Sequence, residues 1–258
     1  MTDSKSKSGD NSKVVVVTGA GSGVGRAVAL AFLDNGDKVA LLGRRQSPLE
    51  ETISQSSASE SAMALPADVT SEENVVAAFA AVAKHFGRID VLFNNAGIFP
   101  KSASFEEIAL ADWETAVDIN LNGSFLCARE AFRYMKAQDP MGGRIINNGS
   151  ISAHAPRPQS AGYTTTKHAI NGLTKSIVLD GRPYNIACGQ IDIGNAATQL
   201  LAGVASEALQ ANGTVMQEPM MSVDEVADAV LSMANLPLAT NIQNMLIMAT
   251  AMPYVGRG

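Results

Sequence analysis

The chain has 258 residues, of which 46% are hydrophobic and 17% are charged, and its formal net charge is -6 at neutral pH. This composition is typical of a globular protein and excludes a disordered one, and the acidic balance argues against general binding to nucleic acid or to anionic membranes. The two cysteines, Cys127 and Cys188, have neither a metal-ligand spacing nor the pattern of a disulfide framework, so we expect two buried thiols in a reducing compartment.

The first twelve residues, MTDSKSKSGDNS, are polar and lack the apolar core of a signal peptide. We therefore expect a flexible leader at residues 1–12, a single catalytic domain over residues 13–258 and a cytoplasmic location. No apolar run approaches the roughly 20 residues that a membrane-spanning helix needs. The three histidines, His85, His154 and His168, have no ligand spacing, so no metal site is expected.

The first predicted element is a buried strand at the four valines of residues 14–17, followed by a glycine-rich turn and a helix that ends at Asn35-Gly36. Four valines without polar alternation are typical of a parallel strand that is covered on both faces. A second strand, KVALLG at residues 38–43, completes a strand–helix–strand unit. Such a unit predicts a parallel sheet with crossover helices.

The same alternation continues to the C-terminus, without an internal repeat or a linker that would mark a second domain. It predicts an α/β fold, a doubly wound parallel sheet of the Rossmann type with helices on both faces. Further helices are predicted at residues 48–57, 72–86, 113–136, 161–181 and 221–237, and further strands at residues 62–68, 89–97, 143–150, 184–193 and 241–250.

The turn after the first strand contains four glycines, Gly19, Gly21, Gly23 and Gly25. Their spacing is neither the Gly-x-Gly-x-x-Gly fingerprint of dinucleotide-binding folds nor that of a P-loop. Backbone amides and the positive end of the helix dipole at such a turn favour a pyrophosphate. The alternative is a tight turn that needs glycines only for their backbone dihedrals.

Tyr163 and Lys167 lie four positions apart in a predicted helix, so their side chains share one helix face. A neighbouring cation favours the phenolate and would lower the pKa of the tyrosine from its ordinary value of about 10. Taken alone, the pair is just as typical of an ordinary amphipathic helix.

Five motifs in order carry a resemblance to a known family. They are TGAGSGVG at residues 18–25, NNAG at residues 94–97, Asn120 in DINLNG, Ser150 thirteen positions before Tyr163, and the Tyr-x-x-x-Lys pair itself. Together they resemble the motifs of the classical short-chain dehydrogenases/reductases over roughly residues 14–195. The resemblance implies an oxidoreductase that transfers a hydride between NAD(P)(H) and a carbonyl or alcohol substrate.

The resemblance also implies roles for individual residues. Tyr163 is the general acid or base, and Ser150 donates a hydrogen bond to the substrate oxygen. Lys167 lowers the pKa of Tyr163 and binds the nicotinamide ribose, and Asn120 holds a water that connects Lys167 to solvent. Asn120 could instead simply break or cap its helix, and Ser152 competes for the serine role without the family spacing. The residues expected to contact the cofactor are Gly19, Ser22, Gly23, Val24, Gly25, Arg44, Arg45, Asp68, Val69, Asn95, Ala96, Gly97, Tyr163, Lys167 and Ile193.

The end of the second strand indicates which cofactor is used. An acidic residue there binds the ribose hydroxyls of NAD, but this chain has Gly43 followed by Arg44 and Arg45. Guanidinium groups suit a phosphate by charge and by geometry, so NADP is expected over NAD. In the alternative, both arginines are solvated and NAD binds through hydroxyl contacts. Asp68, followed by Val69, resembles the acid of the family that binds the adenine amino group, although Asp-Val-Thr-Ser is also a helix N-cap pattern.

The stretch CGQIDIGNAAT, residues 188–198, departs from the family pattern. Gln190 and Ile191 fall where the family has Pro-Gly. Ile193 would contribute backbone contacts to the carboxamide, and Asn195 or Thr198 would replace the threonine of the family.

Three methionines, Met216, Met220 and Met221, lie in the region that covers the substrate in relatives. They could form an adaptable apolar lid, pack in the core or belong to a mobile loop. Trp113 and Asp118 fall on the helix that relatives use for subunit packing, so the resemblance implies a homotetramer. The C-terminal ATAMPYVGRG departs from the family ending and weakens this inference.

Two other functions compete with the oxidoreductase. One is a catalytically idle protein of the same fold that binds a dinucleotide for regulation, and the intact Ser150, Tyr163 and Lys167 argue against it. The other is epimerisation or dehydration of a nucleotide sugar, which predicts extra segments that this compact chain lacks.

Overall fold

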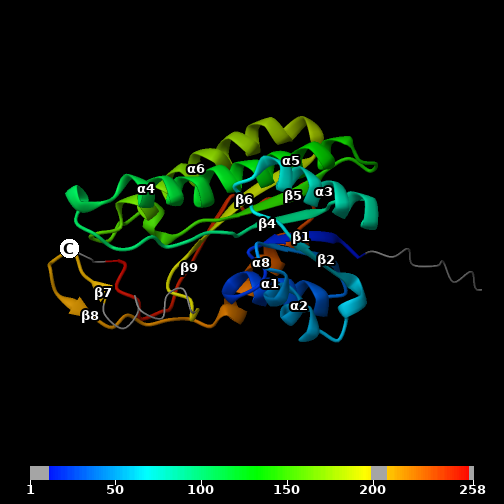
Figure 1. The fold of residues 1–258 in the computed structure, drawn as a ribbon. Coiled ribbons are helices and arrows are strands. Elements are labelled where there is room, and N and C mark those ends of the chain that lie inside the picture. The colour runs from blue at the N-terminus through cyan, green and yellow to red at the C-terminus, as the bar shows by residue number, and fades with distance from the viewer. Residues whose placement is uncertain (1–11, 199–207, 256–258) are drawn as a thin grey trace, which may run out of the picture.

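A seven-stranded sheet forms the centre of the computed structural model, which describes residues 12–198 and 208–255 (Figure 1). All six neighbouring strand pairs of this sheet are parallel. From β1 the chain runs outward to β2 and β3 and then returns to β4 on the other side of β1, which confirms the predicted doubly wound fold. In sheet order the strands are β3 (Ala62–Pro66), β2 (Lys38–Gly43), β1 (Val14–Thr18), β4 (Val91–Asn94), β5 (Gly143–Asn148), β6 (Ile186–Ile193) and β9 (Asn244–Ile247).

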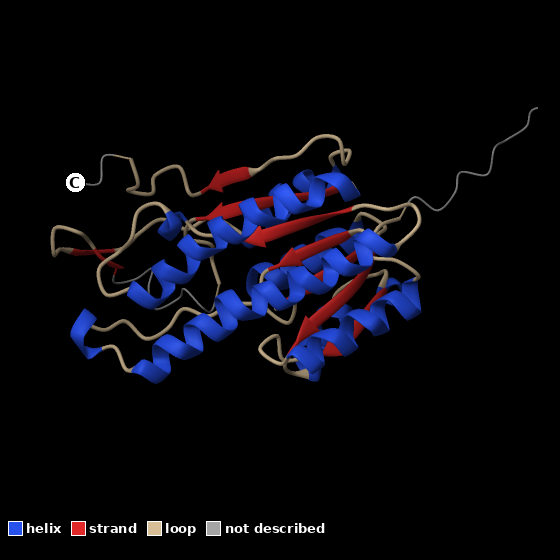
Figure 2. Ribbon diagram, turned by 90° about the horizontal axis from the view of Figure 1, so that it is seen from above, coloured by secondary structure: helices blue, strands red, loops and turns tan. Residues whose placement is uncertain are grey.

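Helices cover both faces of the sheet. In Figure 1 the helices α3, α4, α5 and α6 lie above the sheet, and α1, α2 and α8 lie below it. Seen from above in Figure 2, the helices run along the strands, as crossover connections require. The helix bounds are α1 Gly23–Asp34, α2 Gln46–Ser54, α3 Glu72–Phe86, α4 Leu110–Val117, α5 Gly123–Ala137, α6 Ala161–Gly181 and α8 Val223–Asn235.

The two helix layers explain why β1 shows no polar alternation. All five residues of this strand are buried, and its side chains point alternately to the two faces of the sheet. Val15 and Val17 pack in the core cluster that contains residues of α1 and α8. Val14 and Val16 pack in the opposite cluster with residues of α3 and α5.

The predicted elements form, and several differ at their ends and joints. The strands predicted at residues 62–68, 184–193 and 241–250 and the helix predicted at residues 221–237 are each shorter, at residues 62–66, 186–193, 244–247 and 223–235. The helix predicted at residues 113–136 is two helices, α4 and α5, separated by a π-helical turn at Asp118–Asn122. Helix α2 begins two residues before Pro48, because proline is tolerated anywhere in a first turn that lacks intrahelical N–H partners. The strands predicted at residues 89–97 and 143–150 are shorter at their carboxyl ends, where the chain turns into a pocket.

One further pair of strands was not predicted. β7 (Ala208–Leu209) and β8 (Val215–Met216) form a short antiparallel hairpin outside the main sheet. Two residues are too few for a period of alternation to show in the sequence.

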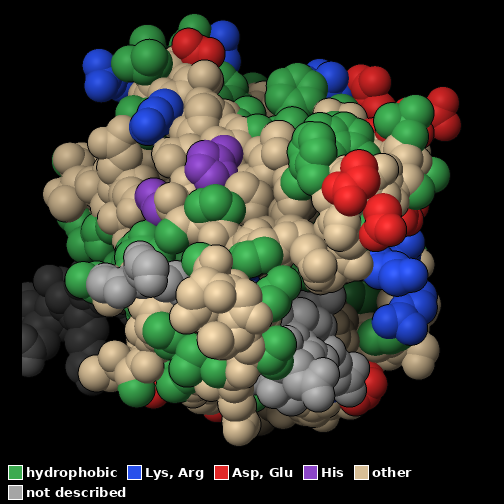
Figure 3. Space-filling view, turned by 90° about the vertical axis from the view of Figure 1, so that its left-hand side faces the viewer, with side chains coloured by type: hydrophobic (Ala, Val, Ile, Leu, Met, Phe, Trp, Pro, Cys, Tyr) green, Lys and Arg blue, Asp and Glu red, His purple; other side chains and the backbone are tan. Residues whose placement is uncertain are grey.

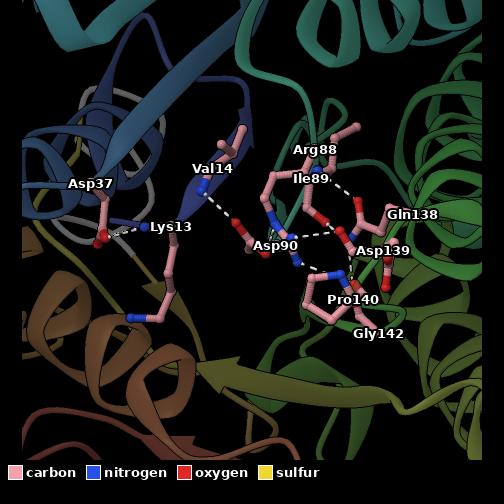
Figure 4. A network of polar contacts seen from close by, with 10 residues as sticks. All are labelled: Lys13, Val14, Asp37, Arg88, Ile89, Asp90, Gln138, Asp139, Pro140 and Gly142. Carbon is pink, nitrogen blue, oxygen red and sulfur yellow. Dashed lines mark hydrogen bonds and ion pairs between the residues drawn. The ribbon is translucent and has the colours of Figure 1, made fainter. Parts of the chain in front are cut away.

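Two carboxylates hold the amino edge of the sheet together (Figure 4). Asp37 is buried and accepts a hydrogen bond from the Lys13 backbone nitrogen at 2.9 Å. Asp90 accepts one from the Val14 backbone nitrogen at 2.9 Å, and Arg88 donates to its other oxygen at 2.7 Å. These contacts satisfy backbone amides at the start of β1, at the edge opposite to the pocket described below.

Of the predicted polar leader, only Ser12 lies within the described residues. Among the helices in the described ranges, none has the length and apolarity needed to cross a membrane.

Candidate active site

A pocket of about 230 Å³ opens at the carboxyl edge of the sheet, beyond the ends of β1, β4, β5 and β6. Figure 3 faces this side of the molecule and shows hydrophobic side chains across it, with most charged side chains towards the rim. Ligands of doubly wound folds bind at this edge, where the strand order reverses. The predicted site residues that line the pocket are Gly19, Ser22, Gly23, Val24, Gly25, Asn95, Ala96, Gly97, Tyr163, Lys167 and Ile193.

The glycine turn forms one wall of the pocket. Gly19 and Gly23 have positive φ values of 69° and 52°, a conformation that other residues rarely adopt. A Cβ on Gly25 would lie 2.3 Å from the Gly19 backbone oxygen, so the loop can close only around glycine. Helix α1 begins here, and the side chain of its N-cap Ser22 makes no capping hydrogen bond. The first-turn amides are therefore suited to a pyrophosphate, and the turn also needs its glycines for their dihedrals.

The NNAG motif is tied to the end of β1. Thr18 Oγ1 accepts hydrogen bonds from the backbone nitrogens of Asn95 and Ala96, both at 2.8 Å. Asn95 Nδ2 donates to the Thr18 backbone oxygen at 2.9 Å, and Asn148 Nδ2 donates to Asn95 Oδ1 at 2.7 Å. The motif thus joins the carboxyl ends of β1, β4 and β5 beside the glycine turn.

A second pocket of about 150 Å³ continues the first towards β2 and β3, and the two share Gly19, Ala96, Gly97 and Ile98. Its lining includes the predicted Arg44, Asp68 and Val69. This arrangement suits the adenosine half of a dinucleotide, whose other half would extend past the glycine turn.

Asp68 is not the N-cap of α3. That position belongs to Ser71, whose side chain accepts a hydrogen bond from the Asn74 backbone nitrogen at 3.2 Å. Asp68 Oδ1 accepts from the Thr70 backbone nitrogen at 3.0 Å and from its hydroxyl at 2.8 Å. The Thr70 hydrogen bonds, with the charge of Arg44 as a smaller cause, hold the pKa of this carboxyl below its ordinary value.

The structure does not bring Arg45 to either pocket. Its backbone forms the N-cap of α2, its side chain is exposed, and it is absent from both linings. Arg44 alone of the two predicted arginines lines the second pocket.

Tyr163 and Lys167 lie in the first two turns of α6 and line the same pocket, as their spacing predicted. The ring of Tyr163 packs against Phe99, with ring centroids 4.6 Å apart. Lys167 Nζ donates a hydrogen bond to the Asn148 backbone oxygen at 2.8 Å and lies 5.5 Å from the centroid of the Tyr163 ring.

The pKa values of this pair differ from the expectation. Burial raises the pKa of Tyr163, and a hydrogen bond with Ser150 and the charge of Arg157 only partly oppose this shift. Burial also lowers the pKa of Lys167, to about 8. The net pKa of the phenol is thus raised, because desolvation outweighs the neighbouring charges, and the lowering of this pKa by Lys167 stays a prediction.

Ser150, rather than Ser152, is the serine that contacts Tyr163. Its side chain is buried, shares a hydrogen bond with the phenol and accepts another from the Ser152 backbone nitrogen at 3.1 Å. Ser152 therefore supplies an amide that orients the Ser150 hydroxyl.

Asn120 sits on the π-helical turn with 1% of its surface exposed. Its Oδ1 accepts from the Ile98 backbone nitrogen at 2.8 Å, and its Nδ2 donates to the Ile98 backbone oxygen at 3.0 Å and to Thr166 Oγ1 at 3.3 Å. The asparagine thus interrupts the helix and also fixes the chain beyond NNAG against α6.

Thr198 and Asn195 have different surroundings. Thr198 lines the pocket, and its methyl carbon lies 3.1 Å from the point where a Cβ of Gly23 would be. Asn195 Nδ2 donates to Glu218 at 2.8 Å, and its Oδ1 accepts from Arg157 at 2.9 Å. Asn195 therefore belongs to a buried polar network behind the pocket.

The three methionines do not form a lid over this pocket, since none of them is in its lining. Met221 is buried, and its backbone pairs with Ala196. Met216 and Met220 are exposed.

Several residues of the site were missed by sequence reasoning. Most directly follow or precede a recognised motif, and this adjacency was the available signal. Asp192 was also missed, although an acidic residue in an otherwise buried strand that ends at the site is itself a signal. The missed lining residues are Ile98, Phe99, Asn148, Gly149, Gly194 and Ala196.

A family model described as short chain dehydrogenase matches residues 13–208. The chain belongs to this family. As a short-chain dehydrogenase/reductase it is an oxidoreductase, and its pockets fit a nicotinamide dinucleotide.

Two relatives with different substrates in their names are similar to this chain. The chain is 36% identical over 180 residues to a 3beta-hydroxysteroid dehydrogenase of Mediterraneibacter gnavus, a match that covers 69% of this chain and 64% of the relative, just under two thirds of its length. It is 34% identical over 230 residues to the 2-(R)-hydroxypropyl-CoM dehydrogenase of Xanthobacter autotrophicus, covering 86% of this chain and 91% of the relative.

Solved structures agree with this assignment. A 3-ketoacyl-(acyl-carrier-protein) reductase from Brucella melitensis, complexed with NADH, superimposes with a TM-score of 0.82 at 26% identity, covering 93% of this chain and 98% of that one. An alcohol dehydrogenase from Thermococcus sibiricus, complexed with 5-hydroxy-NADP, superimposes with a TM-score of 0.80 at 23% identity, covering 93% and 97%. The second likeness concerns the fold alone.

Proposed function

We propose that the protein is a carbonyl reductase or alcohol dehydrogenase that transfers a hydride between NADP(H) and a carbonyl or alcohol substrate, with Tyr163 as the general acid or base. The observation that carries this proposal is the meeting of Tyr163 and Lys167 in a pocket whose wall is the glycine turn, with Ser150 next to Tyr163 although outside the pocket lining. A protein that only binds a dinucleotide does not need this cluster.

The protein's own residues would provide proton transfer and charge stabilisation. When bound, the nicotinamide supplies or accepts the hydride. Because burial raises the pKa of Tyr163, its phenol keeps its proton at neutral pH and can give it to a carbonyl oxygen. The Ser150 hydroxyl would donate a hydrogen bond to the same oxygen and stabilise the charge that develops on it.

Lys167 would bind the nicotinamide ribose. Its ammonium carries three donors, one of which is used by the Asn148 backbone oxygen. The remaining donors suit ribose hydroxyls. Asn120 would be a positioning residue, because its side chain is hydrogen-bonded to the backbone of Ile98 and holds this residue at the pocket wall.

Arg44 supports NADP over NAD. It lines the pocket for the adenosine half, beside Gly43, where an acid would bind the ribose hydroxyls of NAD. A guanidinium favours the 2′-phosphate by charge and by hydrogen-bond geometry. Use of NAD through hydroxyl contacts is the alternative.

A secondary alcohol or ketone is the substrate class that we propose. The names of the relatives refer to hydroxysteroid, hydroxypropyl and ketoacyl compounds. The apolar side chains of Ile98, Phe99 and Ala196 in the pocket suit an apolar body next to the reacting group.

We also propose a homotetramer, from the family resemblance, and a cytoplasmic location, from the two free buried thiols, which suit a reducing compartment. Exposed apolar side chains on α4 and α5, Leu110 and Phe125, are compatible with subunit packing. Light scattering coupled to size-exclusion chromatography would measure the oligomeric state, and a monomer would contradict this part.

The test follows the absorbance of NADPH and NADH at matched concentrations over a panel of ketones, aldehydes, quinones and β-keto esters. Tyr163→Phe keeps the ring packing with Phe99 and removes only the hydroxyl. Turnover in this variant should fall by roughly 100-fold or more, which is what general acid catalysis contributes. Turnover that survives the change would contradict the mechanism. Binding of NADPH without any turnover in the wild type would favour the catalytically idle alternative.

Two arginine variants form a matched pair for the cofactor. Arg44→Ala should raise the KM for NADPH by about tenfold or more and leave that for NADH nearly unchanged. Arg45→Ala, one position further and outside both pockets, should change neither. Equal effects of Arg44→Ala on the two cofactors would contradict the NADP preference.

A further inference from the structure

Asp192 is a fully buried carboxylate at the carboxyl end of β6. Its Oδ1 accepts hydrogen bonds from the Ser150 backbone nitrogen at 3.0 Å and from Gln190 Nε2 at 2.6 Å. Its Oδ2 accepts from Asn244 Nδ2 at 2.7 Å and lies 2.7 Å from His154 Nε2. Four groups of donor type surround the two oxygens, which suits a carboxylate that only accepts hydrogen bonds and places a proton on Nε2 of His154.

The chain before Ser150 is shaped around this carboxylate. A Cβ on Gly149 would lie 1.9 Å from Asp192 Oδ1, so only glycine lets the loop approach so closely. The approach allows the hydrogen bond between Asp192 and the Ser150 amide, across 42 positions of sequence. Ser150 in turn shares its hydroxyl with Tyr163. Asp192 thus contacts the backbone of Ser150 directly, and Ser150 lies between Asp192 and Tyr163 in this series of contacts.

We propose that Asp192 is a positioning residue that holds Ser150 in place against Tyr163, with His154 completing its shell of donors. This inference rests on the proposed function, because the roles of Ser150 and Tyr163 belong to it. Asp192 has no position in the pocket lining and acts through the backbone of its neighbour.

The charge of Asp192 also reaches the two titrating groups of the site. Burial raises the pKa of Tyr163, and Asp192 adds to that shift, whereas Arg157 opposes it. Burial lowers the pKa of Lys167 to about 8, and Asp192 opposes that shift. The charge therefore keeps both the phenol and the ammonium protonated to higher pH.

Ionisable groups face Asp192 from two of the described elements around it. Tyr163 and Lys167 come from α6, and His154 from the segment between β5 and α6. From β6 and β9 the neighbours are neutral amides, those of Gln190 and Asn244.

The experiment compares Asp192→Asn with Asp37→Asn. Asp37 is likewise buried and accepts from a backbone nitrogen, but it lies at the opposite edge of the sheet, so it controls for the loss of a buried carboxylate. In Asp192→Asn the new NH₂ faces donors, which displaces Ser150. We expect kcat to fall by about 10- to 100-fold, while the affinity for NADPH changes by less than about twofold. Amide exchange in residues 149–155 should also rise. Asp37→Asn should leave kcat, the affinity for NADPH and this amide exchange unchanged.

The pH profile of ketone reduction separates positioning from stability alone. Without the charge of Asp192, both Lys167, whose pKa is about 8, and the phenol lose their protons at lower pH. The basic limb of the kcat profile, where Lys167 titrates first, should therefore move to lower pH by about half a unit or more. Wild-type kcat with an unmoved limb in Asp192→Asn would overturn the proposal. The proposal would also be overturned if Asp192→Asn and Asp37→Asn both lowered kcat in proportion to their loss of stability.

His154→Ala provides a second variant, since its ring is 35% exposed and can be removed with little disturbance of packing. It should lower kcat by about threefold or more, and His154→Gln, which restores a donor, should recover part of the loss. If Asp192→Asn does not fold, wild-type kcat in His154→Ala overturns the proposal. Tyr163→Phe in the same assay distinguishes a failure of the proposed function from a failure of the positioning role of Asp192. Turnover that survives Tyr163→Phe contradicts the proposed function, independently of the result for Asp192→Asn.

Discussion

The ammonium group of Lys167 donates a hydrogen bond to the backbone oxygen of Asn148, 2.8 Å away, and so joins α6 to the carboxyl end of β5. The side chain of Asn148 continues the chain of contacts to Asn95, which is bonded to the end of β1. A buried cation thus stands where three strand ends and one helix meet. Because Lys167 is only 5% exposed, its charge is costly to keep, and burial lowers its pKa to about 8.

The lysine should leave a signature in the pH dependence of stability. Between pH 8 and pH 10.5 the unfolded chain, with an ordinary lysine, binds more protons than the folded chain. The free energy of unfolding of the wild type should therefore rise with pH relative to that of Lys167→Met, by up to about 1.4 kcal/mol per pH unit. Urea denaturation of the wild type and of Lys167→Met between pH 8 and pH 10.5 measures the difference between their free energies of unfolding. The contributions of all other titrating groups are common to both proteins and cancel in this difference. A difference that stays flat with pH would be evidence against the lowered pKa.

Replacing Asn120 should loosen the pocket wall. Asn120→Ala leaves the backbone N–H and C=O of Ile98 without their side-chain partners, which should cost about 2–3 kcal/mol of stability and reduce kcat. Asn122→Ala on the same π-helical turn is the control, because Asn122 is exposed and should change stability by less than about 0.5 kcal/mol. Denaturant midpoints and steady-state kinetics of the two variants measure both effects. Equal midpoints would contradict the prediction.

Two glycine-to-alanine changes should act in opposite directions. Gly25→Ala forces a Cβ to 2.3 Å from the Gly19 oxygen and 2.7 Å from Asn95 Nδ2, so we expect at least about a tenfold loss of NADPH affinity and lower stability. Gly172→Ala meets nothing within 4 Å on an exposed helix position and should stabilise the protein by about 0.5–1 kcal/mol without affecting binding. Fluorescence titration with NADPH and thermal denaturation give the two values. An unchanged affinity in Gly25→Ala would show that the turn does not form the binding site.

The buried pair of Arg157 and Glu218 should hold the segment around β7 and β8 against the site. Glu218 is fully buried and also accepts from Asn195 at 2.8 Å and from Gln210 at 2.9 Å. Arg157→Met leaves this carboxylate without its cation, at a cost of about 3–5 kcal/mol, and should increase amide exchange in residues 208–221. Adding Glu218→Gln should recover part of the stability. If the double variant is less stable than the single one, the ion pair is not the cause.

The two thiols should be inert in the folded protein. Burial raises the pKa of Cys127 to about 12 and that of Cys188 further above its ordinary range. A thiolate reagent at mildly alkaline pH should therefore label neither cysteine in the native state and both after unfolding in urea. Rapid labelling of the native protein would contradict their burial.

Spacing along the chain predicted the fold, and the resemblance to the short-chain dehydrogenases/reductases predicted most residues of the candidate site. Hydrophobic runs and periodicity depend on neighbouring residues, so they predicted the alternating strands and helices, and α3 and α6 were predicted to the residue. The relation of Tyr163 to Lys167 follows from one helix face. The carboxyl ends of parallel strands share one edge, which is why motifs far apart in sequence line one pocket.

Only the tertiary structure decided what depends on burial and on contacts across the chain. The raised pKa of Tyr163 reflects desolvation by segments that the local sequence does not reveal. The choice of Thr198 over Asn195 for the pocket depends on where Arg157 and Glu218 pack. The bond between Asp192 and the Ser150 amide joins adjacent strand ends, and no spacing rule predicts which side chain meets which backbone group there, because that depends on packing in three dimensions.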